Sequence, residues 1–573
     1  MQISIGEALR QGISAHEDGR FQEAENIYRA ILHIDSKHPD ANHNLGVLAV
    51  SSYQPDKALP FLETALKTNP NIEQFWLSYI DALIQNDQTN DAEIAIKEFE
   101  EAGFNAVKIE GLRTQLKAQI EGGKPTPAHI KNLLRIFKVG ETEEAKTLAT
   151  LMTQKYPKEP LPWKILGAVL GQMGRNYEAV QACEDALLLS PCDPEIHNNL
   201  GNLRKALGKF DEAETSLRKA LELKPDFIGA HSNLGSILLE KGDYEGSLNC
   251  FKRSFELKRG GIKPIGIKQD QPLEISKAKL THDIEQFEYL ASLSIQKEYF
   301  SLLADKFRSV IDEINWPSDA ELVTVMPKFK PILSNGSRII HVKQAGRIKK
   351  ALNSSLDADA ITKSYCSHDH GLTYVDNFLN TEALNKLREF LLESTIWFEV
   401  KKGGYLGAYL NDGLATPLIF QISSELKAKL PLIIGDHTLN QVWAYKYDSS
   451  ANIRGSDLTG IKIHADFAAI NVNFWVTQSE ANQDPDSGGL IVYDTEAPAE
   501  WSFEMYNNNV GRIQEELRKS GGGRTKIPYQ ENRMVIFNSN LFHETDEYNF
   551  RPGYINRRIN VTMLFGRRKT ALL

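Results

Sequence analysis

Cysteine is scarce in this chain, and its arrangement excludes a common way of stabilising small domains. The 573 residues contain four cysteines, none of them in a CxxC pair, and a chain of this length has no need of a disulfide framework. We therefore interpret them as buried thiols of a protein in a reducing compartment; they are Cys183, Cys192, Cys250 and Cys366.

Long apolar runs are also missing. No stretch of about 18 apolar residues occurs, and the first residues, MQISIGEALRQG, form an amphipathic segment without the basic, apolar and small-residue blocks of a signal peptide. These absences argue against a membrane partner and predict a cytoplasmic protein.

Positive charge is in deficit. With 66 Lys and Arg against 75 Asp and Glu, the net charge is −9, which argues against nucleic acid or an anionic membrane as a partner of the whole chain. The one basic cluster, Arg567 to Lys569, stands near the end and is interpreted as a solvated tail.

What is present is the composition of a folded protein with several domains. Apolar residues make up 41% and charged residues 25% of the chain, as in ordinary globular proteins. Single cores stop growing near ~250 to 300 residues, so 573 residues predict at least two domains.

The N-terminal half repeats itself every 34 residues. Three sets of markers share this period: Gly167, Gly201 and Gly235; Gly140, Gly174, Gly208 and Gly242; and Pro157, Pro191 and Pro225. Alanines mark a second helix at Ala145, Ala179 and Ala213, and again at Ala24, Ala58 and Ala92. The two alanine sets are out of phase by about 19 residues, which predicts an insertion near 105–125. We count about seven repeats and assign residues 1–259 to this array.

Trp163-x-x-Leu166-Gly167, followed by Ala179 and Pro191, resembles the tetratricopeptide repeat. The resemblance implies pairs of antiparallel helices that stack into an all-α superhelix with a concave face. That face would bind a protein or peptide partner, although the array could instead act as a spacer. Recurring first-helix residues are either groove or packing positions; they are His43, Asn44, His197, Asn199, His231 and Asn233.

A second region, residues 260–369, is predicted to be a helical bridge or linker. Gly260, Gly261 and the following KPIGIKQDQP interrupt the helical periodicity, which resumes from Leu273 to about Ile314 and ends before Trp316-Pro317.

From about residue 370 to 573 the pattern changes to short alternating apolar segments. LTYV, QVWAYKY, INVNFWVT, GGLIVY, RMVIFN and RRINVTMLFG are separated by turn residues, without the long helices that a parallel sheet needs. An antiparallel barrel or jelly roll is predicted.

Two histidines and one carboxylate in this region suit a metal ion. His464 and Asp466 are two residues apart, so on a strand both side chains point to the same face. His543 follows another apolar strand 77 residues later. Two imidazoles and one carboxylate leave open coordination positions, as Fe(II) oxygenases require.

The last predicted strand carries a cation. Alternation places Arg558, Asn560 and Thr562 on one face, and a guanidinium matches a carboxylate with two hydrogen bonds. A β-bulge would present Arg557 in place of Arg558.

The order VDNFL, YKYD, HAD, FNSNLFHE and the arginine strand resembles the 2-oxoglutarate and Fe(II)-dependent dioxygenases, in their prolyl-hydroxylase-like branch. RINVT is also similar to the R-x-N-x-T strand of the oxidative nucleic-acid demethylases. The resemblance covers about 370–568 and implies a double-stranded β-helix with supporting helices, Fe(II), O2, and 2-oxoglutarate as cosubstrate. Oxidative decarboxylation of 2-oxoglutarate would yield succinate, CO2 and an oxidant that attacks a C–H bond.

The resemblance implies His464, Asp466 and His543 as metal ligands. Arg558, Thr562 and Tyr447, or Tyr445 on the same face, would bind the cosubstrate. Asn473 would line the pocket or pack beside it, and Trp475 is expected to pack.

Two further patterns are interpreted as loops. His368-Asp369-His370 precedes the first strand of the barrel without a ligand partner at useful spacing, and Gly521 to Gly523 lack the setting of a phosphate-binding loop. The glycine segment is expected to be flexible and could act as a lid.

The function expected from these patterns is a dioxygenase that hydroxylates a protein or peptide side chain recruited by the repeats. The alternatives are an oxygenase of a small molecule whose repeats serve complex assembly, and a non-catalytic repeat scaffold with a metal-binding, cupin-like barrel.

Overall fold

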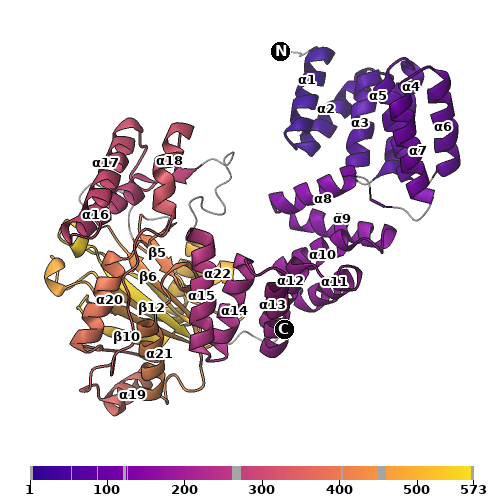
Figure 1. Cartoon of the computed structure of the whole chain (residues 1–573). Helices are drawn as coiled ribbons and strands as arrows, with labels where there is room; N and C mark the ends of the chain where they lie inside the picture. Colours follow the sequence, from indigo (N-terminus) through magenta and orange to yellow (C-terminus); the bar gives the residue numbers. More distant parts are fainter. Residues whose placement is uncertain are drawn as a thin grey trace. The chain divides into compact units, whose positions relative to one another are not determined.

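The computed structural model describes residues 4–52, 54–86, 88–120, 124–125, 127–260, 273–401, 404–448 and 460–568. Its internal contacts divide the chain into two compact units, Met1–Lys209 and Phe210–Leu573. Each unit is described by itself below, and Figure 1 colours both along the sequence.

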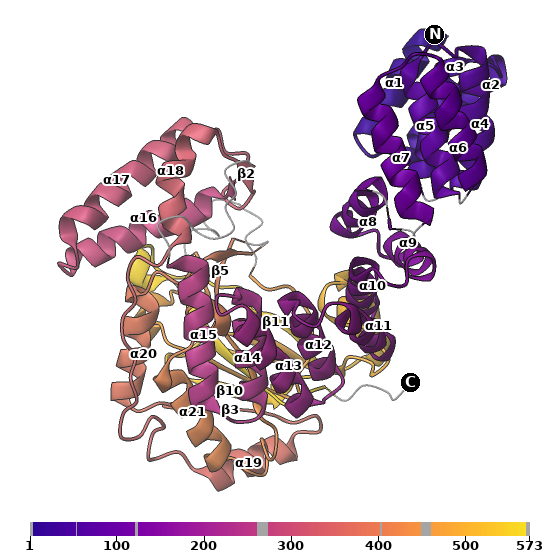
Figure 2. The same cartoon turned by 45° about the vertical axis from the view of Figure 1, so that its right-hand side comes forward.

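Unit 1 is entirely helical in its described residues, and consecutive helices run antiparallel in stacked pairs (Figures 1 and 2). The helices are α1 (Ile5–Glu17), α2 (Phe21–Ile34), α3 (Pro39–Ser51), α4 (Pro55–Thr68), α5 (Glu73–Gln85), α6 (Thr89–Glu101), α7 (Ala106–Ile120), α8 (Pro127–Val139), α9 (Thr142–Lys155), α10 (Pro160–Gln172), α11 (Asn176–Leu189) and α12 (Pro194–Ala206). Helix α7 occupies the place where the phase of the repeat changes.

Glycines make the helical pairs compact. At Gly167 of α10, an added Cβ would lie 2.4 Å from the Cys183 Sγ of α11, so only glycine allows these helices to approach so closely. Gly174, between the same two helices, has φ +75°, a conformation that side chains with a Cβ rarely adopt. The 34-residue glycine period therefore has two separate physical causes.

The recurring histidines of the first helices are packing residues. His197 Nε2 lies 3.0 Å from the carbonyl oxygen of Pro191, six residues earlier, and His231 Nε2 lies 2.8 Å from that of Pro225. Trp163 Nε1 donates to the carbonyl of Pro157 in the same way. His43, one residue out of this register, lies 2.9 Å from Ser78 Oγ in the next pair of helices. These contacts favour the packing alternative for the histidines, which are half-buried, as are Asn44, Asn199 and Asn233.

Unit 2 begins with the last helices of the repeat array. It contains α13 (Phe210–Leu223), α14 (Ile228–Glu240), α15 (Tyr244–Arg259), α16 (Lys277–Ser292), α17 (Lys297–Glu313), α18 (Lys330–Leu333), α19 (Ala358–Ser367), α20 (Thr381–Glu393), α21 (Pro417–Lys429), α22 (Phe503–Asn507) and α23 (Val510–Ser520). The repeat pattern places α13 to α15 in the N-terminal domain, but Phe251 and Phe255 of α15 belong to the same apolar core as the sheet. The predicted linker from Gly261 to 272 lies outside the described residues.

The strands of unit 2 form antiparallel pairs. They are β1 (Glu274–Ile275), β2 (Val323–Thr324), β3 (Leu372–Val375), β4 (Glu399–Val400), β5 (Leu406–Tyr409), β6 (Leu439–Lys446), β7 (Ile470–Trp475), β8 (Leu490–Glu496), β9 (Arg524–Ile527), β10 (Met534–Asn538), β11 (Leu541–Thr545) and β12 (Ile559–Phe565). A seven-stranded sheet has the order β3-β10-β7-β12-β6-β5-β4, a three-stranded sheet the order β11-β8-β9, and β1 pairs with β2. Within the described residues no sheet closes into a barrel.

Two apolar cores flank the large sheet. One packs α20 and α21 against β6, β7 and β12, with Leu387, Leu418 and Val442 fully buried (Figure 1). The other contains Trp475, Val492 and Phe537, from strands of both sheets. The sequence interpretation expected supporting helices but did not locate α20, α21 and α23.

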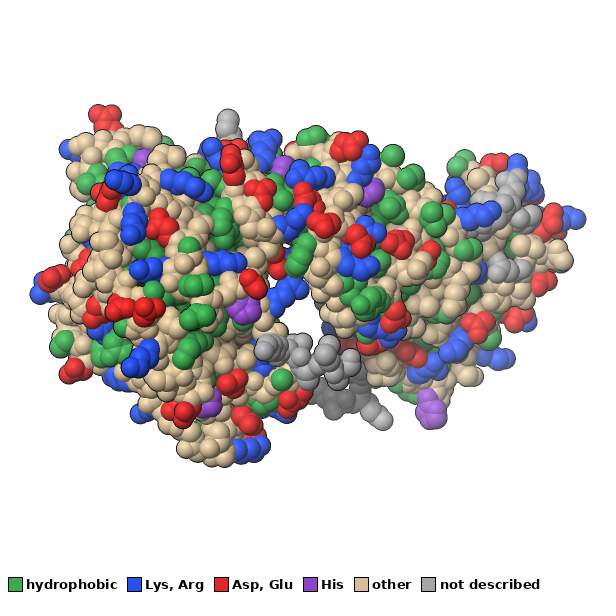
Figure 3. Space-filling model, turned by 90° about the horizontal axis from the view of Figure 1, so that it is seen from below, with side chains coloured by type: hydrophobic (Ala, Val, Ile, Leu, Met, Phe, Trp, Pro, Cys, Tyr) green, Lys and Arg blue, Asp and Glu red, His purple; other side chains and the backbone are tan. Residues whose placement is uncertain are grey.

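Several polar and charged side chains lie in surroundings that differ from the sequence interpretation. The face in Figure 3 mixes acidic and basic side chains. Arg568 is buried and donates to the carbonyls of Ala497 and Pro498, so the interpretation as a solvated tail was wrong for Arg568. Arg567 is exposed and pairs with Glu240 at 3.0 Å, and Lys569 lies outside the described residues. Cys183 is buried, but Cys192 and Cys366 are exposed, which contradicts their interpretation as buried thiols.

Every described helix is too short or too polar to cross a membrane.

A buried carboxylate joins the last repeat helix to the sheet. Asp412, 4% exposed, accepts hydrogen bonds from Arg259 Nε at 2.9 Å and Nη2 at 2.6 Å and from Lys258 Nζ at 2.8 Å. Burial by itself would raise the pKa of Asp412, but the two cations outweigh it and the pKa is lowered. This carboxylate is therefore ionised in the folded protein.

We expect Asp412→Asn to lower the unfolding free energy of unit 2 at pH 7 by about 2 to 3 kcal/mol, because two partly buried cations lose their counter-charge. A carboxyl with a lowered folded-state pKa stabilises above its unfolded pKa, near 4, and loses that contribution as the pH falls through the folded value. Urea unfolding at pH 7 and pH 3 should thus show a difference between variant and wild type that shrinks at pH 3. Asp211→Asn, at an exposed ion pair on α13, is the matched control, and an equal loss in both variants would contradict the prediction.

Candidate metal centre

The three predicted ligands come from two adjacent extended segments. His464 lies before β7 rather than on it, and forms an isolated antiparallel bridge with His543. His464 N donates to His543 O at 3.0 Å, and His543 N donates to His464 O at 2.8 Å. His543 follows the predicted strand, which is β10, and itself lies within the next strand, β11. The bridge therefore holds the histidine pair together without a regular strand at 464.

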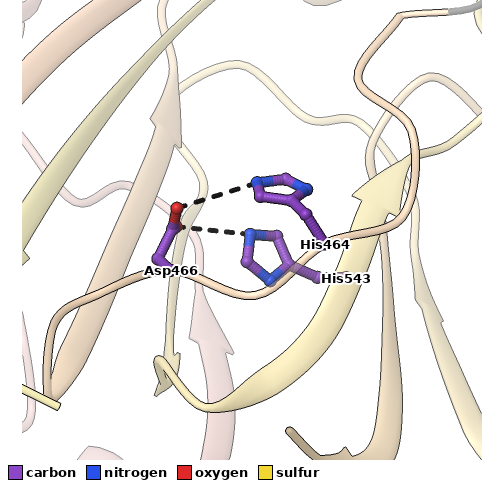
Figure 4. Close-up of side chains that lie close together, drawn as sticks. All are labelled: His464, Asp466 and His543. Carbon is purple, nitrogen blue, oxygen red and sulfur yellow. Dashed lines mark ion pairs between the residues drawn. The ribbon is translucent and has the colours of Figure 1, made fainter. Parts of the chain in front are cut away.

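The side chains converge (Figure 4). His464 Nε2 lies 3.7 Å from Asp466 Oδ1, and His543 Nε2 lies 3.4 Å from Asp466 Oδ2. One ligand atom from each residue lies within 4.8 Å of the others. Two bonds of about 2.1 Å at a right angle span about 3.0 Å, so a small closure of this triad would fit a transition metal.

Backbone carbonyls select the tautomer of both imidazoles. His464 Nδ1 lies 2.9 Å from the carbonyl oxygen of Lys462, and His543 Nδ1 lies 3.0 Å from that of Leu541. In each ring Nδ1 must carry the proton to make this contact, which leaves the Nε2 lone pair directed at Asp466. This is the state in which histidine binds a metal.

The charges of the triad suit a cation. Burial and the neighbouring His543 lower the pKa of His464 to about 4, so its ring is neutral at pH 7. Burial would raise the pKa of Asp466, but contacts with His543, His464 and Asn471 lower it overall. An ionised, buried carboxylate beside the neutral ring of His464 suits a cation.

A row of amides supports the carboxylate. Asn471 Nδ2 donates to Asp466 Oδ2 at 2.6 Å, and Asn473 Nδ2 donates to Asn471 Oδ1 at 2.6 Å. Thr562 Oγ1 donates to Asn473 Oδ1, also at 2.6 Å. We did not identify Asn471 from the sequence, although polar residues at alternate positions of the buried strand β7 were a usable signal.

The triad opens into a cavity of about 740 Å³. Its lining includes the residues that the sequence assigned to cosubstrate binding, Arg558, Tyr447 and Thr562, together with the alternative Tyr445 and with Asn473 and Trp475. Trp475 is 1% exposed and belongs to the core between the sheets, so it both packs and borders the cavity.

Arg558 is a buried cation with spare donors. It is 2% exposed, and its Nε and Nη2 donate to the carbonyls of Gly488 and Gly489 at 2.6 and 3.0 Å. The Tyr447 ring lies 4.6 Å from the guanidinium carbon. Nη1 is buried without a hydrogen-bond partner, and within the described part of the chain no carboxylate forms an ion pair with Arg558.

The neighbouring arginine serves a different purpose. Arg557 Nε pairs with Glu285 of α16 at 2.7 Å, and its Nη2 lies 3.4 Å from Asp448. It does not line the cavity. The register of the strand therefore presents Arg558, Asn560 and Thr562 to the cavity and Arg557 to the helical bridge.

Glycines fix the position of the Arg558 anchor. A Cβ at Gly489 would lie 1.9 Å from the carbonyl oxygen of Ile527 on β9, so this backbone approach requires glycine.

Tyr447 contributes a hydroxyl 3.5 Å from Thr545 Oγ1, and burial raises the pKa of Tyr447. Its phenol is therefore a neutral hydrogen-bond donor.

The remaining two patterns lie away from the triad. His368 and His370 follow α19 in a loop, and each has a carboxylate neighbour on β8 that the sequence did not reveal, Asp494 at 3.6 Å and Glu496 at 3.5 Å. Gly521 ends α23, and Gly523 O accepts a hydrogen bond from Asp494 N, so this segment is a helix-to-strand turn fixed to β8 rather than a flexible lid.

Comparison with known proteins identifies the repeats. The family described as TPR repeat matches residues 201–242, and the family described as tetratricopeptide repeat matches residues 228–260. No curated protein matches the chain.

Three solved structures illustrate the local similarities. The MamA RS-1 ArsTM double mutant shares 17% identity over 38% of this chain and 93% of its own, with a TM-score of 0.22. YrrB, titled a TPR protein with an unusual peptide-binding site, shares 14% over 35% and 95%, with a TM-score of 0.19. The first TPR of Spaghetti (RPAP3), bound to an HSP90 peptide, shares 24% over 19% and 86%, also with a TM-score of 0.19. From the two family matches, residues 201–260 of this chain are tetratricopeptide repeats.

Proposed function

We propose that unit 2 is an Fe(II)- and 2-oxoglutarate-dependent dioxygenase that hydroxylates a C–H bond of a protein or peptide side chain. The observation that carries the proposal is that one cavity contains both His464, Asp466 and His543 and the unpaired buried guanidinium of Arg558. A bound metal alone would explain the triad. A ligand with an anionic end would explain the buried Arg558 as well.

The donor set supports iron. Two imidazoles and one carboxylate are the protein ligand set of non-haem Fe(II) oxygenases and would leave the metal open to other ligands, whereas a structural zinc site is closed by four protein ligands. Iron held here would supply the redox chemistry by which a keto acid and O2 react. His464, Asp466 and His543 would hold the metal on one side and leave its other side facing the cavity.

Arg558 would bind the distal carboxylate of 2-oxoglutarate. Two of its five N–H groups are used by the carbonyls of Gly488 and Gly489, which leaves the Nη1 and Nη2 end of the guanidinium for a carboxylate. A buried cation without a counter-charge is costly, so a dicarboxylate would repay that cost on binding. Tyr447 and Thr562 border the same space.

Once bound, iron, 2-oxoglutarate and O2 supply the oxidation, with succinate and CO2 as coproducts. The chain's own residues orient the reactants. Asn471 holds one oxygen of Asp466, the carbonyls of Lys462 and Leu541 hold the imidazoles, and Trp475 keeps water from the Arg558 side of the cavity.

We also assign the strands to a double-stranded β-helix. The antiparallel pairing of β10, β7, β12 and β6 in one sheet and of β11 with β8 in the other supports this assignment, as does the apolar core to which both sheets contribute. The tetratricopeptide repeats would recruit the protein whose side chain is hydroxylated, because such arrays present extended binding surfaces.

Anaerobic titration with Fe(II) and 2-oxoglutarate tests the activity. We expect a visible metal-to-ligand charge-transfer band that saturates with one iron per chain and is absent with Zn(II). Admission of oxygen should then produce succinate, even without substrate.

Bound iron without the band would contradict the proposal and favour a cupin-like metal site on a scaffold. A band together with succinate that is stimulated by small metabolites, and not by peptides, would favour the small-molecule oxygenase.

A further inference from the structure

One wall of the cavity consists of aromatic rings from β5 and β6. The register of these strands pairs Tyr409 with Trp443 and Gly407 with Tyr445, and Tyr405 immediately precedes β5. We call Tyr405, Tyr409, Trp443 and Tyr445 the aromatic ladder. All four line the cavity, and none is fully buried.

The rings of the ladder contact one another in sequence. Tyr405 and Tyr445 meet edge to face with centroids 5.1 Å apart, and Trp443 and Tyr445 lie 6.0 Å apart. The hydroxyls of Tyr409 and Tyr445 are 3.2 Å apart. At the inner end, Tyr405 stacks at 5.0 Å on Tyr447, the ring beside Arg558. The ladder thus continues outward from the proposed cosubstrate site.

Gly407 makes this arrangement possible. A Cβ at this position would lie 3.0 Å from Cε2 of Tyr409 and 3.2 Å from Cε1 of Tyr445, tighter than ordinary contact. The opposite face of the same strands is filled by Ala408 and Ala444, which belong to the apolar core. At these positions small side chains face the apolar core, and the rings of the ladder face the cavity on the other side of the strands.

The cavity has room for more than the cosubstrate. Pockets of ~300 to 1,000 Å³ hold drug-sized ligands, and 2-oxoglutarate has only ten non-hydrogen atoms. At about 740 Å³ the cavity can hold a second molecule along the ladder. Tyrosine and tryptophan offer apolar faces with polar tips, as recurs in protein-binding surfaces.

The outer end of the ladder carries positive charge and adjoins a repeat helix. Lys401 lies over the Tyr409 ring at 4.9 Å with Glu399 3.8 Å from its Nζ, and the exposed Lys462 lines the same opening. Asn411, two residues after Tyr409, donates to Ser232 Oγ of α14 at 3.0 Å, and α14 packs against β6 (Figure 1). The first helix of the last repeat pair therefore contacts the segment that follows Tyr409.

We propose that the aromatic ladder binds an extended peptide segment, with apolar or ring-bearing side chains on Tyr409 and Trp443 and an acidic residue near Lys401 and Lys462. A peptide fits better than a nucleic acid strand, because two lysines at the mouth are too few to follow a phosphate backbone. Hydroxylation of the peptide rests on the proposed function, but its binding does not.

A display library of random 12-residue peptides tests the ladder on the full chain with Fe(II) and 2-oxoglutarate under argon. Peptides retained by wild type are passed over the Tyr409→Ala/Trp443→Ala double variant, and those not retained there are collected. We expect this pool to be enriched in an acidic residue beside apolar or aromatic residues.

Fluorescence anisotropy then gives Kd for individual peptides. Trp443→Ala and Tyr409→Ala should each weaken binding about tenfold or more, as truncation of an aromatic hot spot does. Lys401→Glu and Lys462→Glu, which alter charges at the mouth, should weaken acidic peptides and leave neutral ones unchanged. Tyr177→Ala, an exposed tyrosine of α11, is the matched control and should bind like wild type.

An empty pool, or peptides whose Kd is the same in ladder variants and wild type, would overturn the proposal. Ladder-dependent binding of a 12-residue oligothymidylate in place of peptides would also overturn it and assign the wall to nucleic acid. The charge-transfer band of the same wild-type sample separates the two ideas, since its absence removes the oxygenase and leaves the peptide result standing.

Discussion

Asp466→Ala is expected to abolish 2-oxoglutarate turnover, with a loss of at least about a thousandfold in succinate formation. Asp466 is the only carboxylate of the triad and is 4% exposed, so no described side chain can replace its charge between His464 and His543. Removing one of three ligands should weaken metal affinity by more than the ~10- to 100-fold seen for supporting residues. Isothermal titration with Fe(II) and a succinate assay measure both effects.

The matched control for this variant is Asp494→Ala. Asp494 lies on β8 of the small sheet and is near His368, away from the cavity lining. It should retain metal binding and turnover, and both variants should keep the helical signal of wild type in circular dichroism. Wild-type turnover in Asp466→Ala would remove the triad as the metal centre.

Arg558→Ala is expected to raise the KM for 2-oxoglutarate by about a hundredfold, because a charge-assisted pair with a carboxylate contributes about 3 kcal/mol and each 1.4 kcal/mol is tenfold. Metal binding should be preserved, since Arg558 does not contact the triad. Arg558→Lys should recover only part of the loss, because an ammonium cannot present the planar guanidinium end to a carboxylate. Initial rates of succinate formation over a range of 2-oxoglutarate concentrations measure the effect.

Arg557 provides the contrast for this prediction. Its guanidinium pairs with Glu285 and Asp448, so Arg557→Ala should lower the unfolding free energy of unit 2 while leaving the KM for 2-oxoglutarate nearly unchanged. If the KM rises in Arg557→Ala and not in Arg558→Ala, the assignment of Arg558 is wrong.

Local sequence signals predicted the elements whose period is set by packing. The 34-residue spacing of glycine and proline predicted paired helices, because each glycine has a local reason to recur. Gly167 lies against Cys183 of the paired helix, and Gly174 adopts a positive φ in the turn. Alternation along RRINVT predicted that Arg558, Asn560 and Thr562 share a face, because side chains of a strand alternate whatever lies beside it. Supporting helices were expected, but α20 and α21 were not located because strands on either side of them dominated the pattern.

The sequence by itself therefore determined the repeats, the two-residue spacing of His464 and Asp466 and the common face of Arg558, Asn560 and Thr562. Each depends on the backbone period of one segment. Only the tertiary structure decided that His543 bridges to His464, that Asn471 holds Asp466, that Arg558 is anchored by Gly488 and Gly489, and that the last repeat helices share a core with the sheet. These features join residues far apart in the chain or on different strands, and no local period encodes which distant backbone will be brought beside a given side chain.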